Sequence, residues 1–99
     1  MLSWFDTAPS RTFATELATL ILTELAAQTK AKSKVAKFTP KAQKTLQKAA
    51  RSLQAFKAEH PLNFYKKSKL ANAFLWTLKD GGCSPAYADE LTEWLTLRL

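Results

Sequence analysis

Glycine and proline are scarce in this chain and stand at only a few positions. The 99 residues contain two adjacent glycines, Gly81 and Gly82, and four prolines. This is too few for the many tight turns of a β-sandwich or an antiparallel barrel. Alanine, leucine and lysine are plentiful, and all three favour helices. The sequence therefore predicts an all-α protein.

The same residues predict where the helices begin and end. Thr39-Pro40 and Ser84-Pro85 each combine an N-cap residue with a first-turn proline, and Asn63 can cap a helix of its own. Pro61 and the Gly pair end the preceding helices. The predicted helices span about residues 11–29 (with Ser10 as N-cap), 40–59, 64–79 and 85–97. We expect one domain over residues 1–99, a small four-helix bundle with short connections, an N-terminal extension (1–9) and a Lys-rich linker (30–38) between the first two helices.

Apolar residues cover an unusually wide arc of the first predicted helix. They span about 200° of the helical wheel, whereas a surface helix usually shows a stripe of just over about 100°. The members of this arc are Phe13, Ala14, Leu17, Ala18, Leu20, Ile21, Leu22 and Leu25. The helix is therefore either central or covered by a second copy of the chain, and we expect a homodimer. Glu24 lies inside the arc, and we expect it either to mark the helix end or to pair with a lysine.

Positive charge is concentrated in the middle of the chain. The formal net charge is +7, and twelve of the 15 Lys and Arg residues lie between residues 30 and 69, where Glu59 is the only acid. On the second predicted helix, cations spaced three, four and three residues apart form one stripe: Lys41, Lys44, Lys48 and Arg51. Its apolar residues point about 150° away from that stripe. They are Ala42, Leu46, Ala49, Leu53 and Phe56.

A row of cations suits the phosphate backbone of nucleic acid, because neutralising phosphates releases counterions. The predicted binding residues are Lys30, Lys32, Lys34, Lys37, Lys41, Lys44, Lys48, Arg51, Lys66, Lys67 and Lys69. Only three arginines are present, and base readout favours the guanidinium group. We therefore expect binding of low sequence specificity and leave DNA or RNA open. In the competing interpretations the lysines only maintain solubility, or they meet an acidic protein or an anionic membrane.

The third predicted helix carries aromatic residues on two faces. Its expected core face consists of Phe64, Ala71, Phe74, Leu75 and Leu78. The other face, with spacing four, three and four, holds Tyr65, Lys69, Asn72 and Trp76. Trp76 could pack inside the chain, for example under Trp4-Phe5. Alternatively, Tyr65, Asn72 and Trp76 form a self-association interface, or bases stack on the rings. A protein-interaction module of this kind is the main alternative function.

Residues with catalytic or metal-binding chemistry are few. The single cysteine, Cys83, follows the Gly pair, where we expect it to be exposed, and the single histidine, His60, lies in a different loop. The last helix offers carboxylates but no cation before Arg98, which disfavours a DNA-reading helix-turn-helix. We therefore expect a non-enzymatic protein with no cofactor, metal site or small-molecule substrate. The N-terminus lacks the pattern of a secretory signal and no apolar run is long enough for a membrane span, so we expect a cytoplasmic protein that does not insert into membranes.

Overall fold

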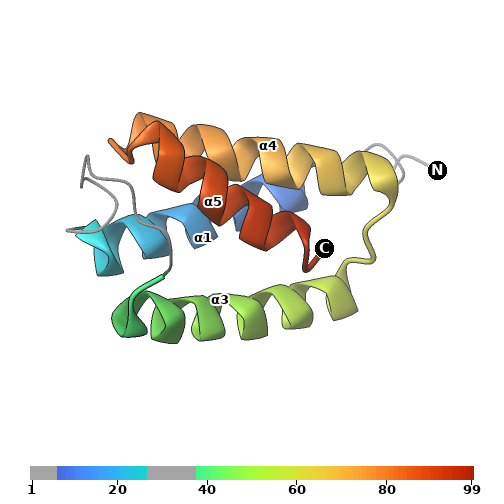
Figure 1. The fold of residues 1–99 in the computed structure, drawn as a ribbon. Helices are drawn as coiled ribbons and strands as arrows, with labels where there is room; N and C mark the ends of the chain where they lie inside the picture. The colour runs from blue at the N-terminus through green and yellow to red at the C-terminus, as the bar shows by residue number, and fades with distance from the viewer. Residues whose placement is uncertain (1–6, 27–37) are drawn as a thin grey trace.

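The computed structural model describes residues 7–26 and 38–99. Within these ranges the chain forms four α-helices and no strand: α1 (Ala8–Glu24), α3 (Pro40–Glu59), α4 (Phe64–Asp80) and α5 (Pro85–Thr96). Successive helices run in opposite directions, so that α1 and α4 run the same way (Figure 1). The predicted all-α four-helix bundle is confirmed, and short connections join α3 to α4 and α4 to α5.

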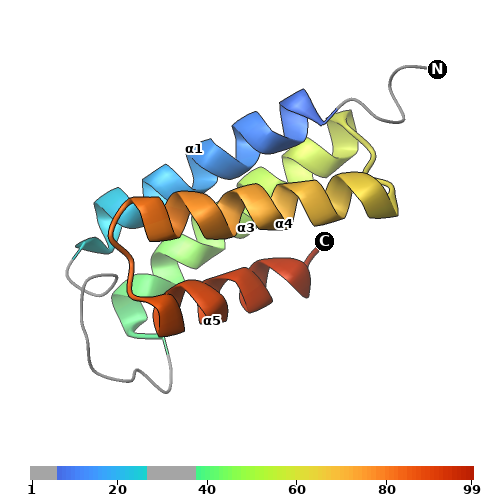
Figure 2. The same ribbon diagram turned by 90° about the horizontal axis from the view of Figure 1, so that it is seen from above.

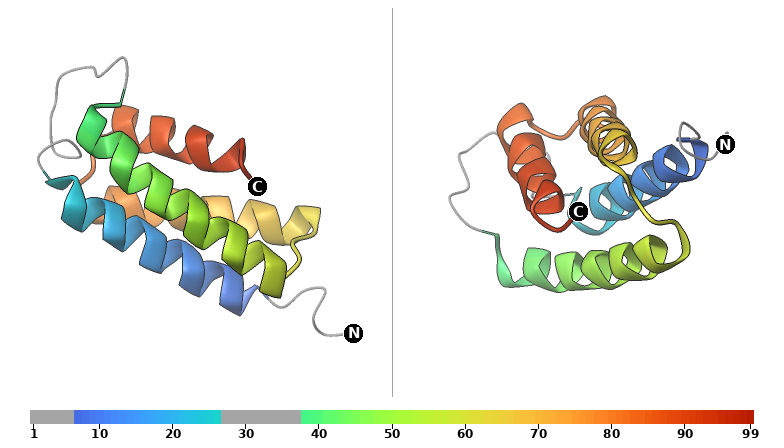
Figure 3. Two further views of the ribbon diagram at one scale, coloured as in Figure 1. Left: turned by 90° about the horizontal axis from the view of Figure 1, so that it is seen from below. Right: turned by 90° about the vertical axis from the view of Figure 1, so that its right-hand side faces the viewer.

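The helices do not pack against one another equally. α1 packs most extensively against α4, which also packs against α5, whereas α3 contacts α1 more sparsely. α3 lies on the side of α1 away from α4 (Figures 1 and 3), and seen from above it lies beneath the other helices (Figure 2). The largest fully buried side chains are Ile21, Leu25, Leu53, Leu70, Phe74, Leu78, Leu91 and Leu95. α1 therefore lies between α3 and α4, as its wide apolar arc predicted for a central helix.

Three helices begin where the sequence predicts. The Thr39 hydroxyl accepts the Ala42 N–H at 3.1 Å, and the Asn63 side-chain oxygen accepts the Lys66 N–H at 2.8 Å. Each satisfies one of the backbone donors that a helix start leaves unpaired. α5 begins at Pro85 after Ser84, although the Ser84 side chain makes no capping hydrogen bond.

The prediction for the start of the first helix is wrong. α1 begins at Ala8 with Pro9 in its first turn, and Thr7 occupies the N-cap position. Ser10, the predicted N-cap, is buried inside the helix. The reason is that Pro9 supplies the same first-turn signal as Pro40 and Pro85. Ala8 and Pro9 thus belong to α1 rather than to an extension over 1–9, and residues 1–6 lie outside the described residues.

Other boundaries also differ from expectation. α1 ends at Glu24, before the predicted 29, and residues 27–37, with most of the predicted linker, lie outside the described residues. Gly82 has a φ of 91° in the turn before α5, a conformation that glycine adopts without steric cost. Phe64 is 85% exposed rather than part of the core. It is the first residue of α4, and because helical side chains tilt toward the N-terminus, no preceding turn of α4 lies beneath it. Leu70 is buried on α4 instead.

Candidate nucleic-acid interface and the α1–α4 groove

The outward face of α3 presents a row of cations to solvent. We call Lys41, Lys44, Lys48 and Arg51 the α3 row; all four are exposed. The predicted packing face is confirmed, because Ala42, Leu46, Ala49 and Leu53 are buried and Phe56 is partly buried. At 1.5 Å per residue the row extends over about 15 Å. Residues 40–58 include no Asp or Glu, so no carboxylate of α3 lies within the row.

The row begins at the N-terminus of α3. Lys41 lies in the first turn, which contains no acidic residue. The aligned peptide dipoles already place partial positive charge at a helix N-terminus, so a cation there adds to the positive potential. An anion beside Lys41 would be favoured both by the side chain and by the helix end.

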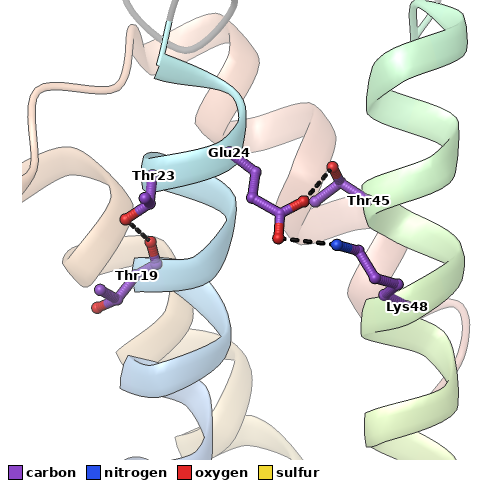
Figure 4. Close-up of polar contacts among 5 residues, drawn as sticks. All are labelled: Thr19, Thr23, Glu24, Thr45 and Lys48. Carbon is purple, nitrogen blue, oxygen red and sulfur yellow. Dashed lines mark hydrogen bonds and ion pairs between the residues drawn. The ribbon is translucent and has the colours of Figure 1, made fainter.

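One member of the α3 row already has a partner inside the chain. The Lys48 ammonium lies 2.9 Å from one carboxylate oxygen of Glu24, and the Thr45 hydroxyl donates to the other oxygen at 3.0 Å (Figure 4). The hydrogen bonds from Lys48 and Thr45 outweigh the effect of burial and lower the pKa of Glu24, with further electrostatic contributions from Lys48 and Lys41. Both expectations for Glu24 are confirmed, since it ends α1 and pairs with a lysine. The pair links α1 to α3.

The cations at the start of α4 do not extend the α3 row. Lys66 and Lys67 are half-buried, and Lys69 is exposed. α3 begins beside the end of α1, whereas α4 begins beside the start of α1, at the opposite end of the bundle (Figure 1). The structure thus separates two groups of cations that the sequence analysis combined. Lys30, Lys32, Lys34 and Lys37 lie outside the described residues.

Lys69 instead borders a groove between α1 and α4 that holds exposed aromatic residues. One part is lined by Thr7, Arg11, Tyr65, Lys69, Asn72, Ala73 and Trp76. The next part is lined by Ala8, Arg11, Thr12, Thr15, Glu16, Ala73, Trp76, Thr77 and Asp80. We call both parts together the α1–α4 groove. The Lys69 ammonium lies 5.5 Å from the centre of the Tyr65 ring, and that of Lys79 lies 5.6 Å from the Trp76 ring.

The groove decides between the interpretations of Trp76. The ring is 57% exposed and Tyr65 is 40% exposed, so Trp76 does not pack inside the described part of the chain, while Trp4-Phe5, the suggested cover, lies outside the described residues. The reason is that α4 packs through Leu70, Phe74 and Leu78, which leaves the edge with Trp76 uncovered. Tyr65, Asn72 and Trp76 line one surface, as the self-association and base-stacking interpretations both require.

A further groove lies between α3 and α5. It is lined by Phe38, Gln43, Leu46, Gln47, Ala50, Trp94 and Arg98. The Arg98 guanidinium lies 4.4 Å from the centre of the Trp94 ring, within the range of a cation–π contact. The Lys57 ammonium donates to the Arg98 carbonyl at 3.0 Å. The hydrogen bond from Lys57 to Arg98 joins the residues after α5 to the last turn of α3.

The lone cysteine and histidine form no reactive pair. Cys83 is buried rather than exposed, and burial raises its pKa to about 11. Its backbone N–H donates to the Leu78 carbonyl, and its side chain joins the core. His60 is exposed and stacks on Phe56, with 4.8 Å between ring centres. Among the described residues, no group of three or more His, Cys, Asp and Glu residues is placed to hold a metal ion.

Comparison with known proteins found no match, so a proposal of function must rest on the surfaces described above. No family model matches the chain. No curated protein and no solved structure matches it either. In the part of the chain that the structure describes, no helix is long and apolar enough to cross a membrane.

Proposed function

We propose that the chain binds the phosphate backbone of nucleic acid through the α3 row, with low sequence specificity and without catalysis. The observation that supports this function is the continuity of the row. Four exposed cations follow one another along about 15 Å of a helix, and residues 40–58 contain no carboxylate.

The dimensions of the row suit a nucleic-acid strand. Successive phosphates of one strand advance by about 3.4 Å along the duplex axis, so about 15 Å corresponds to roughly four phosphates. Like charges at this spacing repel by a few tenths of a kcal/mol per pair. A polyanion relieves this repulsion and releases its own counterions. Three of the four side chains are lysines, which act as point charges and carry little sequence information.

The distribution of acidic residues favours this function over solubility alone. A surface that serves only solubility needs charges of both signs, interspersed. Here Glu24 of α1 meets the row at Lys48, and other acids lie elsewhere, with Asp80 at the end of α4 and Asp89, Glu90 and Glu93 on α5. On α3 the single acid is Glu59, its last residue.

Fluorescence anisotropy with labelled mixed-sequence DNA and RNA oligonucleotides tests the proposal. The triple variant Lys41→Gln, Lys44→Gln, Arg51→Gln removes three charges from the row and leaves the Lys48–Glu24 pair in place. We expect an affinity loss of at least about tenfold in 50 mM salt. We also expect a salt slope shallower by about 2.7 for duplex DNA, since three phosphate contacts are lost.

The matched control is Lys66→Gln, Lys67→Gln, Lys69→Gln, which removes the same charge from the start of α4. It should change affinity by less than about threefold, since these side chains lie outside the α3 row. Equal losses in the two variants would mean that net charge alone, not the row, attracts nucleic acid. If the wild-type protein binds no oligonucleotide in 50 mM salt, the row serves solubility and the proposal fails.

A further inference from the structure

We infer that the α1–α4 groove is a homodimer interface, in which a second copy of this chain docks with its own groove in the opposite direction. The groove and its charges are the basis of this interface, which is independent of nucleic-acid binding by the α3 row.

The groove carries opposite charges toward its two ends. α1 and α4 run in the same direction, so their early turns lie together (Figure 1). These early turns contribute the cations Arg11 and Lys69, of which Arg11 lines both parts of the groove, and later turns contribute the carboxylates Glu16 and Asp80. Lys69 and Asp80 are separated by about 16 Å of helix rise. In the described part of the chain the only ion pair is Lys48–Glu24, so none of these four groups has an opposite charge bound to it.

A two-fold axis would pair all of these charges at once. In a symmetric dimer the same patch is used by both copies, so a contact from one residue to another occurs twice. Rotation by 180° about an axis through the middle of the groove places the end with Arg11 and Lys69 against the partner's end with Glu16 and Asp80. Two copies aligned in the same direction would instead place like charges together, which is unfavourable.

The middle of the groove has the composition of an interface core. Trp76 lines both parts of the groove and is 57% exposed. Trp and Tyr are enriched in interface cores and often carry much of the binding energy. Around Trp76 lie small side chains such as Ala73, Thr12 and Thr77, which allow close approach. The Thr77 hydroxyl donates to the Ala73 carbonyl at 2.8 Å, so burial would leave no donor of Thr77 unpaired.

The proposed dimer leaves the α3 rows uncovered. No described residue of α3 lines the α1–α4 groove. α3 lies on the side of α1 away from α4 (Figure 3). Each copy would therefore keep its own α3 row free for a ligand.

Sedimentation equilibrium, without nucleic acid, tests the interface through charge reversal. The wild-type protein at micromolar concentration should reach twice the chain mass of 11.1 kDa. The variant Arg11→Glu, Lys69→Glu makes every charged residue that lines the groove acidic, and Glu16→Lys, Asp80→Lys makes every one basic, while Lys79 beside the Trp76 ring is unchanged in both. Each variant alone should remain a monomer, because like charges then face each other. An equimolar mixture of the two should form a heterodimer, because opposite charges then face each other at both ends.

A matched pair of aromatic substitutions tests the position of the interface. Trp76→Ala should weaken the dimer by at least about tenfold, as expected for a central interface residue. Phe64→Ala removes a ring that is 85% exposed but lies outside the groove, and it should leave the dimer unchanged. Circular dichroism checks that each variant is folded. The inference is overturned by a monomeric wild-type protein up to several hundred micromolar, by charge variants that fail to associate when mixed, or by a dimer that loses affinity only with Phe64→Ala.

Discussion

The α3 row and the α1–α4 groove are both made of exposed side chains on amphipathic helices, but their charges are arranged differently. The four side chains of the row are all cations, although Lys48 is paired with Glu24 of α1. The groove carries Arg11 and Lys69 toward one end, Glu16 and Asp80 toward the other and Trp76 between them. A surface of uniform charge attracts a polyanion in any register, whereas a surface with two signs fixes the orientation of its partner. The polyanion binding that we propose for the row therefore requires charge alone, whereas the dimer that we propose for the groove also requires a fixed orientation.

The two surfaces also differ in how firmly their helices are held. α1 and α4 are the most extensively packed pair, and α3 is attached mainly to α1. Beneath the row, α3 depends on a few buried side chains such as Leu46 and Leu53, together with the Lys48–Glu24 pair. The rings of the groove are largely exposed, and we expect them to contribute less to the stability of the fold.

The largest expected effect is on the free energy of unfolding, and it compares a buried residue of α3 with an exposed residue of the groove. Leu53 is fully buried, and Leu53→Ala should lower the free energy of unfolding by about 2–5 kcal/mol. Trp76→Ala removes a larger side chain from an exposed position and should change this free energy by no more than about 0.5 kcal/mol. Urea denaturation of dilute monomer gives both values. A loss above about 2 kcal/mol for Trp76→Ala would mean that the groove ring supports the fold and would remove the contrast.

The next largest expected effect is the loss of affinity with salt, which should differ between DNA binding at the row and dimerisation at the groove. With four phosphate contacts, affinity for duplex DNA should fall about 100-fold between 50 and 200 mM salt. The dimer should weaken only a few-fold, because exposed ion pairs contribute little and part of its interface is apolar. Anisotropy and sedimentation over the same salt series provide the two slopes. Parallel slopes would show that the two surfaces act by the same electrostatic attraction.

The smallest effect lies within the α3 row itself. Lys44→Gln relieves repulsion from Lys41 and Lys48 and should raise stability by a few tenths of a kcal/mol. Lys48→Gln removes the partner of Glu24 and should lower stability slightly. Thermal unfolding of the two variants at pH 7 should therefore shift in opposite directions.

The pH dependence of that difference follows from Glu24. The pKa of Glu24 is lowered in the folded protein from its ordinary 4.5, so the pair stabilises the fold above that pH. This contribution is lost as the pH falls through the folded-state pKa. The Lys48→Gln penalty should therefore be present at pH 6 and shrink as the pH falls below 4.5 and through the lowered pKa of Glu24. A penalty that is unchanged near pH 3 would show that Lys48 supports the fold through its aliphatic chain rather than through the pair.

Local signals in the sequence were sufficient to predict most of the helix starts and the buried face of α3. Thr39 and Asn63 cap their helices as predicted, because capping depends on residues only three apart. Pro9 carried an equally local signal that the prediction of Ser10 as N-cap overlooked. The 3.6-residue period also identified the buried and exposed faces of α3 correctly.

Features that depend on how helices meet could not be predicted in this way. Which lysine pairs with Glu24 depends on how α1 is aligned with α3. The apolar period of one helix carries no information about this alignment. The period placed Tyr65, Asn72 and Trp76 on one face, but only the positions of α1 and α5 show that this face stays uncovered. Similarly, the turn after Gly82 directs Cys83 into the core, although its position in a glycine turn indicated exposure.

The pairing of α1 with α4 also has a consequence for the order in which the chain folds. α1 ends at Glu24 and α4 begins at Phe64. About forty residues must therefore be synthesised after α1 before α4 begins, which takes a few seconds at the rate of translation. During that interval the apolar arc of α1, with Leu17 and Ile21, lacks its main partner. The α4–α5 hairpin closes over a much shorter turn, and its loop-closure cost is correspondingly smaller. We therefore expect the C-terminal hairpin to form first, and the N-terminal helix, although translated first, to dock onto it afterwards.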